Sequence, residues 1–179
     1  MFSLLASLVF NLALLFAPFF LLKLEGVKNK KLLERIFLKK EKLFPLARRT
    51  IALLGAFLIV LLVEGLVLKT VGVADQEKIA FVVSNANPWL LLMAVTLGPI
   101  AEELFFRGYI QQKLGVFVTS VIFALFHYGY GSIAEIIAAF SVSVLLGLEL
   151  RKNKNIIPCI LAHAFYNLFS ITLILSFYG

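Results

Sequence analysis

Six long apolar runs, separated by short polar or charged segments, organise the chain. A helix needs about 20 apolar residues to cross a bilayer, so each run predicts a transmembrane helix. The first run carries its positive charge after the apolar residues rather than before them, which favours a retained helix over a signal peptide. The pattern predicts an all-α, polytopic membrane protein with about six transmembrane helices in one bundle. The predicted spans are Phe2–Leu22, Thr50–Leu68, Pro88–Ile110, Leu114–Tyr130, Ile133–Leu150 and Ile156–Phe177.

The composition agrees with lipid as the solvent of most side chains. The chain has 179 residues, of which 61% are hydrophobic, and its mean hydropathy is +1.00. Soluble domains of this size are much less apolar. We expect residues 1–179 to form a single membrane domain, in which 1–87 supply accessory N-terminal helices and a basic loop, and 88–179 form the core. The single cysteine, Cys159, excludes an intrachain disulfide and a structural zinc site built from cysteines.

Basic residues mark the ends of the apolar runs and predict the orientation of the protein. The formal net charge is +7, but the basic side chains cluster beside spans rather than over a soluble face, so we expect no nucleic-acid partner. Segment 23–49 holds ten basic and three acidic residues. The positive-inside rule makes this loop cytoplasmic and, by alternation, puts both termini outside. Lys113 and the turn RKNKN at 151–155 fall on the cytoplasmic side in the same topology.

Apolar residues recur at roughly helical spacing within the basic loop, among them Leu32, Leu33, Ile36 and Phe37. This spacing favours an amphipathic helix lying on the inner leaflet. A solvated connecting loop is the alternative.

Two adjacent carboxylates interrupt the third apolar run. A charge at membrane depth costs several kcal/mol unless it is paired or faces a polar cavity, so Glu102 and Glu103 mark a candidate functional site. Arg107 lies four residues after Glu103, on the same helix face, in the order that favours an ion pair. Glu102 projects about 100° away and is free to face a cavity. A buried salt bridge between helices explains Glu103 and Arg107 but leaves Glu102 unexplained.

The only two histidines of the chain also lie in predicted spans. His163 and Asn167 are one helical turn apart and share a face of the sixth span. At about 1.5 Å per residue, their depths from the cytoplasmic end overlap the depth of Glu102, and His127 lies deeper, near the outer end of its span. Two further carboxylates, Glu64 and Glu135, lie near span ends. We expect Glu64 to snorkel or to pair with Lys69, and we assign Glu135 no special role.

Together these side chains suit hydrolysis of an amide in a dry cavity. A carboxylate with a histidine can activate water, and a histidine with an asparagine can donate hydrogen bonds to an oxyanion. Alternatively, Glu102, His127 and His163 could hold a zinc ion that polarises the water. The cofactor therefore stays open, with zinc as the candidate.

The three polar blocks resemble the CPBP family of intramembrane proteases, also called Abi. The family pattern is EExxxR, FxxxH and HxxxN or HxxxD on successive helices, and it is matched by Glu102-Glu103-LFF-Arg107, Phe123-xxx-His127 and His163-xxx-Asn167. The resemblance covers Pro88 to about Phe169. It implies an all-helical fold and the type II CAAX prenyl protease, bacteriocin-processing or self-immunity class.

The resemblance also implies a role for each matched residue. Glu102 would activate water, with His127 helping to position it, and Glu103, held by Arg107, would support the site. His163 and Asn167 would stabilise the oxyanion. Both a metal-dependent and a metal-free, glutamate-dependent mechanism are compatible with the family pattern.

We therefore predict an intramembrane endopeptidase whose cavity opens toward the cytoplasmic half and whose partner is a membrane-associated peptide or prenylated protein. A non-catalytic membrane scaffold or immunity partner with the same helical core is the alternative. A proton-coupled carrier is a third reading, disfavoured by small size and lack of internal repeats.

Overall fold

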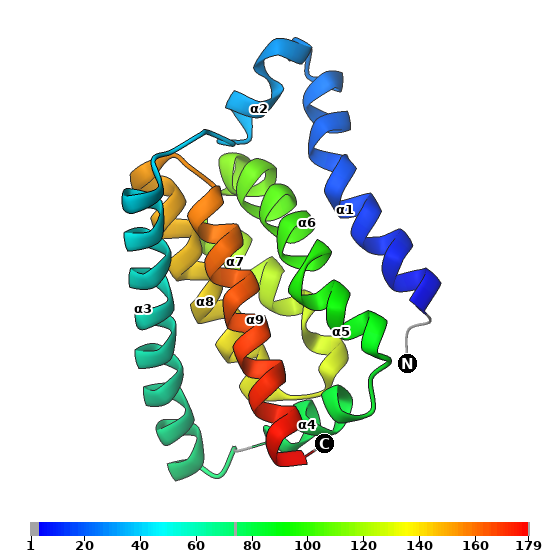
Figure 1. Ribbon diagram of the computed structural model, residues 1–179, viewed down its shortest axis with the longest axis vertical. Coiled ribbons are helices and arrows are strands. Elements are labelled where there is room, and N and C mark those ends of the chain that lie inside the picture. Colours follow the sequence, from blue (N-terminus) through cyan, green and yellow to red (C-terminus); the bar gives the residue numbers. More distant parts are fainter. Residues whose placement is uncertain (1–3, 74, 179) are drawn as a thin grey trace.

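The computed structural model describes residues 4–73 and 75–178, and these form an all-helical bundle without strands (Figure 1). The longer helices are α1 (Leu4–Leu24), α3 (Leu43–Thr70), α7 (Gln111–Phe126), α8 (Ile133–Asn153) and α9 (Ile157–Tyr178). The shorter ones are η1 (Asn29–Lys31), α2 (Leu32–Arg35), α4 (Glu77–Ser84), α5 (Pro88–Val95), α6 (Leu97–Phe105), the π-helical turn η2 (Phe106–Ile110) and η3 (Tyr128–Tyr130).

The prediction of a polytopic all-α membrane protein is confirmed. Five helical segments in the described part of the chain are long and apolar enough to cross a membrane: 4–24, 43–70, 97–130, 133–153 and 157–178. A sixth span results if α4 and α5, which meet at a bend of 116°, count as one. The predicted start of the first span at Phe2 lies outside the described residues.

Gly115 interrupts the long apolar stretch 97–130. Its backbone has φ 77° and ψ 175°, a conformation that glycine adopts readily and other residues rarely do. The chain breaks here, close to the expected boundary at Leu114, and α7 packs against α8. Gly147 permits this close approach, because a Cβ atom at Gly147 would lie 2.8 Å from the side chains of Gln111 and Val116.

The expected third span, Pro88–Ile110, is not one straight helix. It divides at Thr96 (φ −111°, ψ −80°) into α5 and α6, and then continues through the π turn η2. Asn87 begins α5 by accepting a hydrogen bond from the backbone N–H of Trp89 at 2.9 Å, with Pro88 in the first helical position. The break at Thr96 leaves the carbonyl of Ala94 free for a side chain of another helix.

The basic loop is more structured than the sequence pattern indicates. Helix α3 begins at Leu43, seven residues before the predicted Thr50, and the expected amphipathic helix is limited to the four residues of α2. Leu32 and Ile36 are buried against the bundle. Ile36 packs directly against Gly108, at the place where a Cβ atom on that glycine would lie. The apolar spacing therefore reflects docking onto the end of the bundle, and the expectation of a longer membrane-surface helix was wrong.

Polar contacts close both ends of the bundle. At the end that carries α2, Glu25 pairs with Lys113 at 2.7 Å and accepts a hydrogen bond from the hydroxyl of Tyr109 at 2.6 Å. These contacts, that with Lys113 first, lower the pKa of Glu25. At the opposite end, Asp75 accepts hydrogen bonds from the backbone N–H groups of Ile133 (2.9 Å) and Ala134 (3.0 Å), and so caps α8 from a different segment of the chain.

Candidate active site

A buried ion pair lies at the centre of the bundle. Arg107 and Glu103 are both fully buried, and the guanidinium Nε lies 3.2 Å from the Glu103 Oε2. The Arg107 guanidinium also covers the ring of Phe123 at 4.5 Å and donates to the Ser143 carbonyl at 3.4 Å. The ion pair expected from the four-residue spacing is present, and it joins α6 and η2 to α7 and α8.

The same carboxylate holds His163 on α9. Glu103 Oε1 lies 3.0 Å from His163 Nδ1. An ionised carboxylate only accepts hydrogen bonds, so in a bond to the Glu103 carboxylate Nδ1 is the nitrogen that carries the proton. In the neutral imidazole the other nitrogen, Nε2, is then an acceptor, and it lies 3.9 Å from Oε2 of Glu102.

Glu102 presents an unsatisfied acceptor at this point. Its Oε2 is buried and makes no hydrogen bond to any described residue, although a quarter of the side chain (26%) is exposed. Two acceptors 3.9 Å apart do not bond each other directly, but each can accept one proton of a water molecule between them. Glu102 takes no part in the Glu103–Arg107 ion pair, but it lies beside the same imidazole, that of His163.

His127 follows the last residue of α7, and its Nδ1 lies 2.9 Å from the carbonyl oxygen of Phe123. A carbonyl only accepts, so Nδ1 carries the proton in this residue as well. The imidazole packs on the Phe123 ring at 4.7 Å, and the ring of Tyr130 lies 6.0 Å away. His127 Nε2 is left without a hydrogen bond in the described part of the chain and is available for chemistry.

Asn167 lies one turn after His163 on α9, as expected. Its Nδ2 donates to the carbonyl of Ala94 at 2.8 Å, the group exposed by the break between α5 and α6. One N–H of the amide remains for another acceptor. The helix break thus fixes the rotamer of Asn167.

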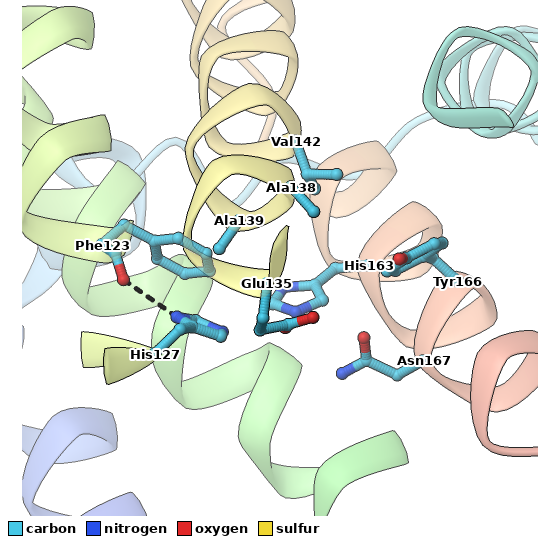
Figure 2. A pocket seen from close by; sticks show the side chains of 9 residues that line it. All are labelled: Phe123, His127, Glu135, Ala138, Ala139, Val142, His163, Tyr166 and Asn167. Carbon is cyan, nitrogen blue, oxygen red and sulfur yellow. Dashed lines mark hydrogen bonds between the residues drawn. The ribbon is translucent and has the colours of Figure 1, made fainter. Parts of the chain in front are cut away.

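A small cavity joins these side chains (Figure 2). It is lined by residues of α7, α8 and α9 together with His127, and its volume of about 30 Å³ exceeds the roughly 10–15 Å³ that one water requires. His127, His163 and Asn167 all lie on its wall, whereas Glu102 does not line it and lies 3.9 Å from His163 Nε2. The full lining is Phe123, His127, Glu135, Ala138, Ala139, Val142, His163, Tyr166 and Asn167.

Glu135 is the residue that sequence reasoning missed. Its neighbourhood, Ser132-Ile-Ala-Glu135, has the spacing of a helix capping box, in which the glutamate side chain returns to the backbone of the serine. Only half of that motif forms: Ser132 Oγ accepts from the Glu135 N–H at 3.1 Å, but no described contact joins the Glu135 carboxylate to the Ser132 N–H. The side chain lines the cavity instead.

Glu64 also differs from expectation. The Ser141 hydroxyl on α8 donates to Glu64 Oε1, and no ion pair with Lys69 occurs among the described residues. Glu64 therefore links α3 to α8 rather than snorkelling to the boundary.

The expected metal ligands do not form a ready site. Within residues 4–73 and 75–178, no group of three or more His, Cys, Asp or Glu side chains is arranged to hold a metal ion. Glu102 and His163 are close together, but His127 does not complete a three-ligand set with them. The donor geometry therefore does not fit the zinc alternative, and we derive no step through a metal.

The cavity lies between the two ends of the bundle. His127 follows α7 and Glu135 lies in the first turn of α8, so these two lining residues lie toward η3 and α4, at the end opposite α2 (Figure 1). His163 lies in the first half of α9, which begins beside the basic segment, where the backbone N–H of Ile156 donates to the carbonyl of Phe37. An opening toward the end with the basic loop stays a prediction.

Comparison with known proteins identifies the family of one segment of the chain. Residues 84–169 match the family model described as "Type II CAAX prenyl endopeptidase Rce1-like". This segment is an Rce1-like domain.

The resemblance to the CAAX protease family is thereby confirmed, and the Rce1-like segment contains every motif residue and Glu135. The chain is also 28% identical over 92 residues to an "Uncharacterized protein" of Mycoplasma capricolum subsp. capricolum, a match covering 48% of this chain and 27% of that protein. The chain thus spans about a quarter of the length of the relative it matches. No solved structure matches.

Helices α1 and α3 lie outside the matched Rce1-like segment but pack directly on it. Helix α1 lies along α6, and α3 contacts α8 and α9. The Asn11 Oδ1 on α1 and the Glu102 Oε1 both lie within 4 Å of the place that a Cβ atom on Gly98 would take. The absence of a side chain at Gly98 therefore keeps space open beside Glu102.

Proposed function

We propose that this protein is an intramembrane endopeptidase that cleaves a membrane-associated protein or peptide with water activated by Glu102. One observation carries the proposal: the unpartnered Oε2 of Glu102 lies 3.9 Å from the Nε2 of His163, whose other nitrogen is held by Glu103. A water between these acceptors has both protons bonded and a lone pair free for attack.

In this proposal Glu102 takes a proton from the water as its oxygen attacks the scissile carbonyl carbon. His163 orients the water rather than donating to the oxyanion, because its only proton in the neutral state is directed to Glu103. This differs from the role that the family resemblance implies for His163. The second N–H of Asn167 stabilises the oxyanion that develops on the carbonyl.

The family match and the position of the cavity between spanning helices support a membrane-associated substrate. The match to prenyl endopeptidases favours a CAAX-type substrate, and processing or immunity toward a bacteriocin-like peptide is the other form of the same hydrolysis. A lipid-anchored or membrane-inserted peptide can reach a cavity between spanning helices from within the bilayer. A soluble peptide is present in the bilayer only at low concentration.

Charge supports an orientation with segment 23–49 in the cytoplasm and both termini outside. In this orientation the Glu135 end of the cavity faces the outer half of the membrane, on the side of α4.

The test is cleavage of a prenylated CAAX-type peptide and of an unmodified membrane-associated peptide by the protein reconstituted in liposomes. Glu102→Gln should lower kcat at least 10²- to 10⁴-fold, the usual range for a lost general base. Glu77→Gln is the control, because Glu77 is exposed in the first turn of α4. Full activity of folded Glu102→Gln would exclude this mechanism and favour a non-catalytic scaffold or immunity partner.

A further inference from the structure

Side-chain hydrogen bonds fix the first turn of α8, which carries Glu135. Its backbone N–H donates to Ser132 Oγ, and the Ser132 hydroxyl donates to Asp75 Oδ1 at 2.7 Å. Asp75 in turn binds the next two backbone N–H groups of α8. The first turn of α8 is thus fixed to the segment between α3 and α4, which fixes where the Glu135 side chain starts.

From this fixed backbone position the Glu135 side chain extends into the cavity. In Figure 2 the carboxyl group of Glu135 projects into the space between His127 on one side and Asn167 on the other. The rest of the wall near it is apolar, formed by Ala138, Ala139 and Val142. Neither a capping bond nor an ion pair within the described residues accounts for this orientation.

His127 lines the same cavity as Glu135. Because His127 Nδ1 donates to the Phe123 carbonyl, any proton that it gains or loses moves at Nε2. No direct ion pair joins Glu135 to His127, and the cavity between them has room for a water. The other titratable groups on the cavity wall are His163 and Tyr166. Tyr130 on η3 packs beside the His127 ring, and Glu102 lies behind His163, 3.9 Å from its Nε2.

We propose that Glu135, together with His127, is the general acid that protonates the leaving amine. The inference rests on the proposed peptidase function and adds to it a catalytic residue outside the three family motifs. It places the acid and the base on different helices: Glu102 on α6 takes the proton of the water, and the Glu135–His127 pair gives a proton to the nitrogen.

The water oxygen forms a bond to the carbonyl carbon, and one water proton passes to Glu102. The C–N bond then breaks, its electron pair stays on nitrogen, and nitrogen takes a proton that Glu135 and His127 hold through an intervening water. Return of the proton from Glu102 to this pair through water in the cavity restores the enzyme, and the products are a carboxylic acid and an amine.

The distinguishing experiment compares two leaving groups. Two membrane-associated peptides of the same sequence are used, one with a scissile amide and one with a scissile aryl ester, whose phenolate departs without a proton. Glu135→Gln should lower kcat for the amide by about 10²- to 10⁴-fold and kcat for the ester by less than about 10-fold, with little change in KM. Glu135→Asp should recover part of the amide activity, and Glu77→Gln should change neither rate.

The outcomes separate the two proposals. Equal loss of amide and ester cleavage in folded Glu135→Gln, or no loss of amide cleavage, would overturn the role of Glu135 and leave the peptidase proposal standing. If Glu102→Gln keeps both activities, the peptidase proposal itself fails. Should Glu135→Gln not fold, the amide-to-ester ratio of Glu135→Asp decides, because a purely structural defect lowers both rates together.

Discussion

His163 Nδ1 lies 3.0 Å from Glu103 Oε1, and the carboxylate of Glu103 is already paired with Arg107. The three side chains form a buried series of contacts that runs from η2 through α6 to α9. These contacts set the tautomer of His163 and turn its Nε2 toward Glu102. The second glutamate of the motif thus acts as a positioning residue, and the first is left free to meet the water.

Replacing the ion pair by apolar residues should separate stability from activity. Arg107→Leu alone leaves a buried, unpaired carboxylate and should cost about 3–5 kcal/mol of unfolding free energy. The double variant Glu103→Leu/Arg107→Leu should recover most of that loss, because replacing both partners of a buried ion pair often leaves the unfolding free energy unchanged. It should nevertheless stay inactive, because His163 is no longer held. Thermal unfolding in detergent and the cleavage assay check the two halves. An active double variant would show that His163 needs no partner.

Asn167→Ala should lower kcat by about 10²- to 10³-fold, as for loss of one oxyanion donor, with a smaller effect on KM. The variant also frees the Ala94 carbonyl, so the unfolding temperature must be measured beside the rate. A rise in KM at constant kcat would instead indicate a role in substrate binding.

Asp75 should make stability depend on pH in the acid range. Burial alone would raise the pKa of Asp75, but hydrogen bonds from Ser132, from the backbone of α8 and from Lys78 outweigh it and hold the pKa well below its usual value. A depressed folded-state pKa stabilises the protein above the unfolded pKa of about 4 and loses that stabilisation as the pH falls below it. We therefore expect the unfolding temperature to begin to fall near pH 5 and to keep falling below pH 3.

Asp75→Asn should lower stability by about 0.5–2 kcal/mol near neutral pH, the range for a lost helix cap, and should flatten that part of the pH profile. Thermal unfolding of both proteins across this pH range is the measurement. Glu77→Gln is the neighbouring control. An unchanged pH slope in Asp75→Asn would assign the acid sensitivity to other carboxylates.

The predicted orientation can be read with single cysteines. The native Cys159 is fully buried, so it should not react with a membrane-impermeant maleimide. Gln76→Cys should be labelled in intact cells and Lys40→Cys only after the membrane is permeabilised; both native side chains are exposed. The reverse pattern would place the Glu135 end of the cavity in the cytoplasm.

Metal dependence provides a further test. Because the histidines and Glu102 do not form a three-ligand group, cleavage should survive dialysis against a chelator. The contrary result is loss of activity restored by zinc, with bound zinc absent from His127→Ala and His163→Ala. That result would require Glu102, His127 and His163 to move together on metal binding.

The sequence by itself determined the spans and the local pairs. Spanning helices follow from apolar length, since every backbone group in lipid must be bonded within its own helix. The Glu103–Arg107 pair follows from a spacing of four residues within one helical segment. The three polar motifs were likewise visible as short blocks at membrane depth.

Only the tertiary structure decided which helices bring their polar faces together. Glu103 and His163 are 60 positions apart, and their contact depends on the rotation and the vertical offset of α6 and α9, neither of which a local pattern records. Glu135 shows the limit most clearly. Its spacing from Ser132 indicates an ordinary helix cap, and the packing of α8 against α7 and α9 turns the same side chain into the wall of the cavity.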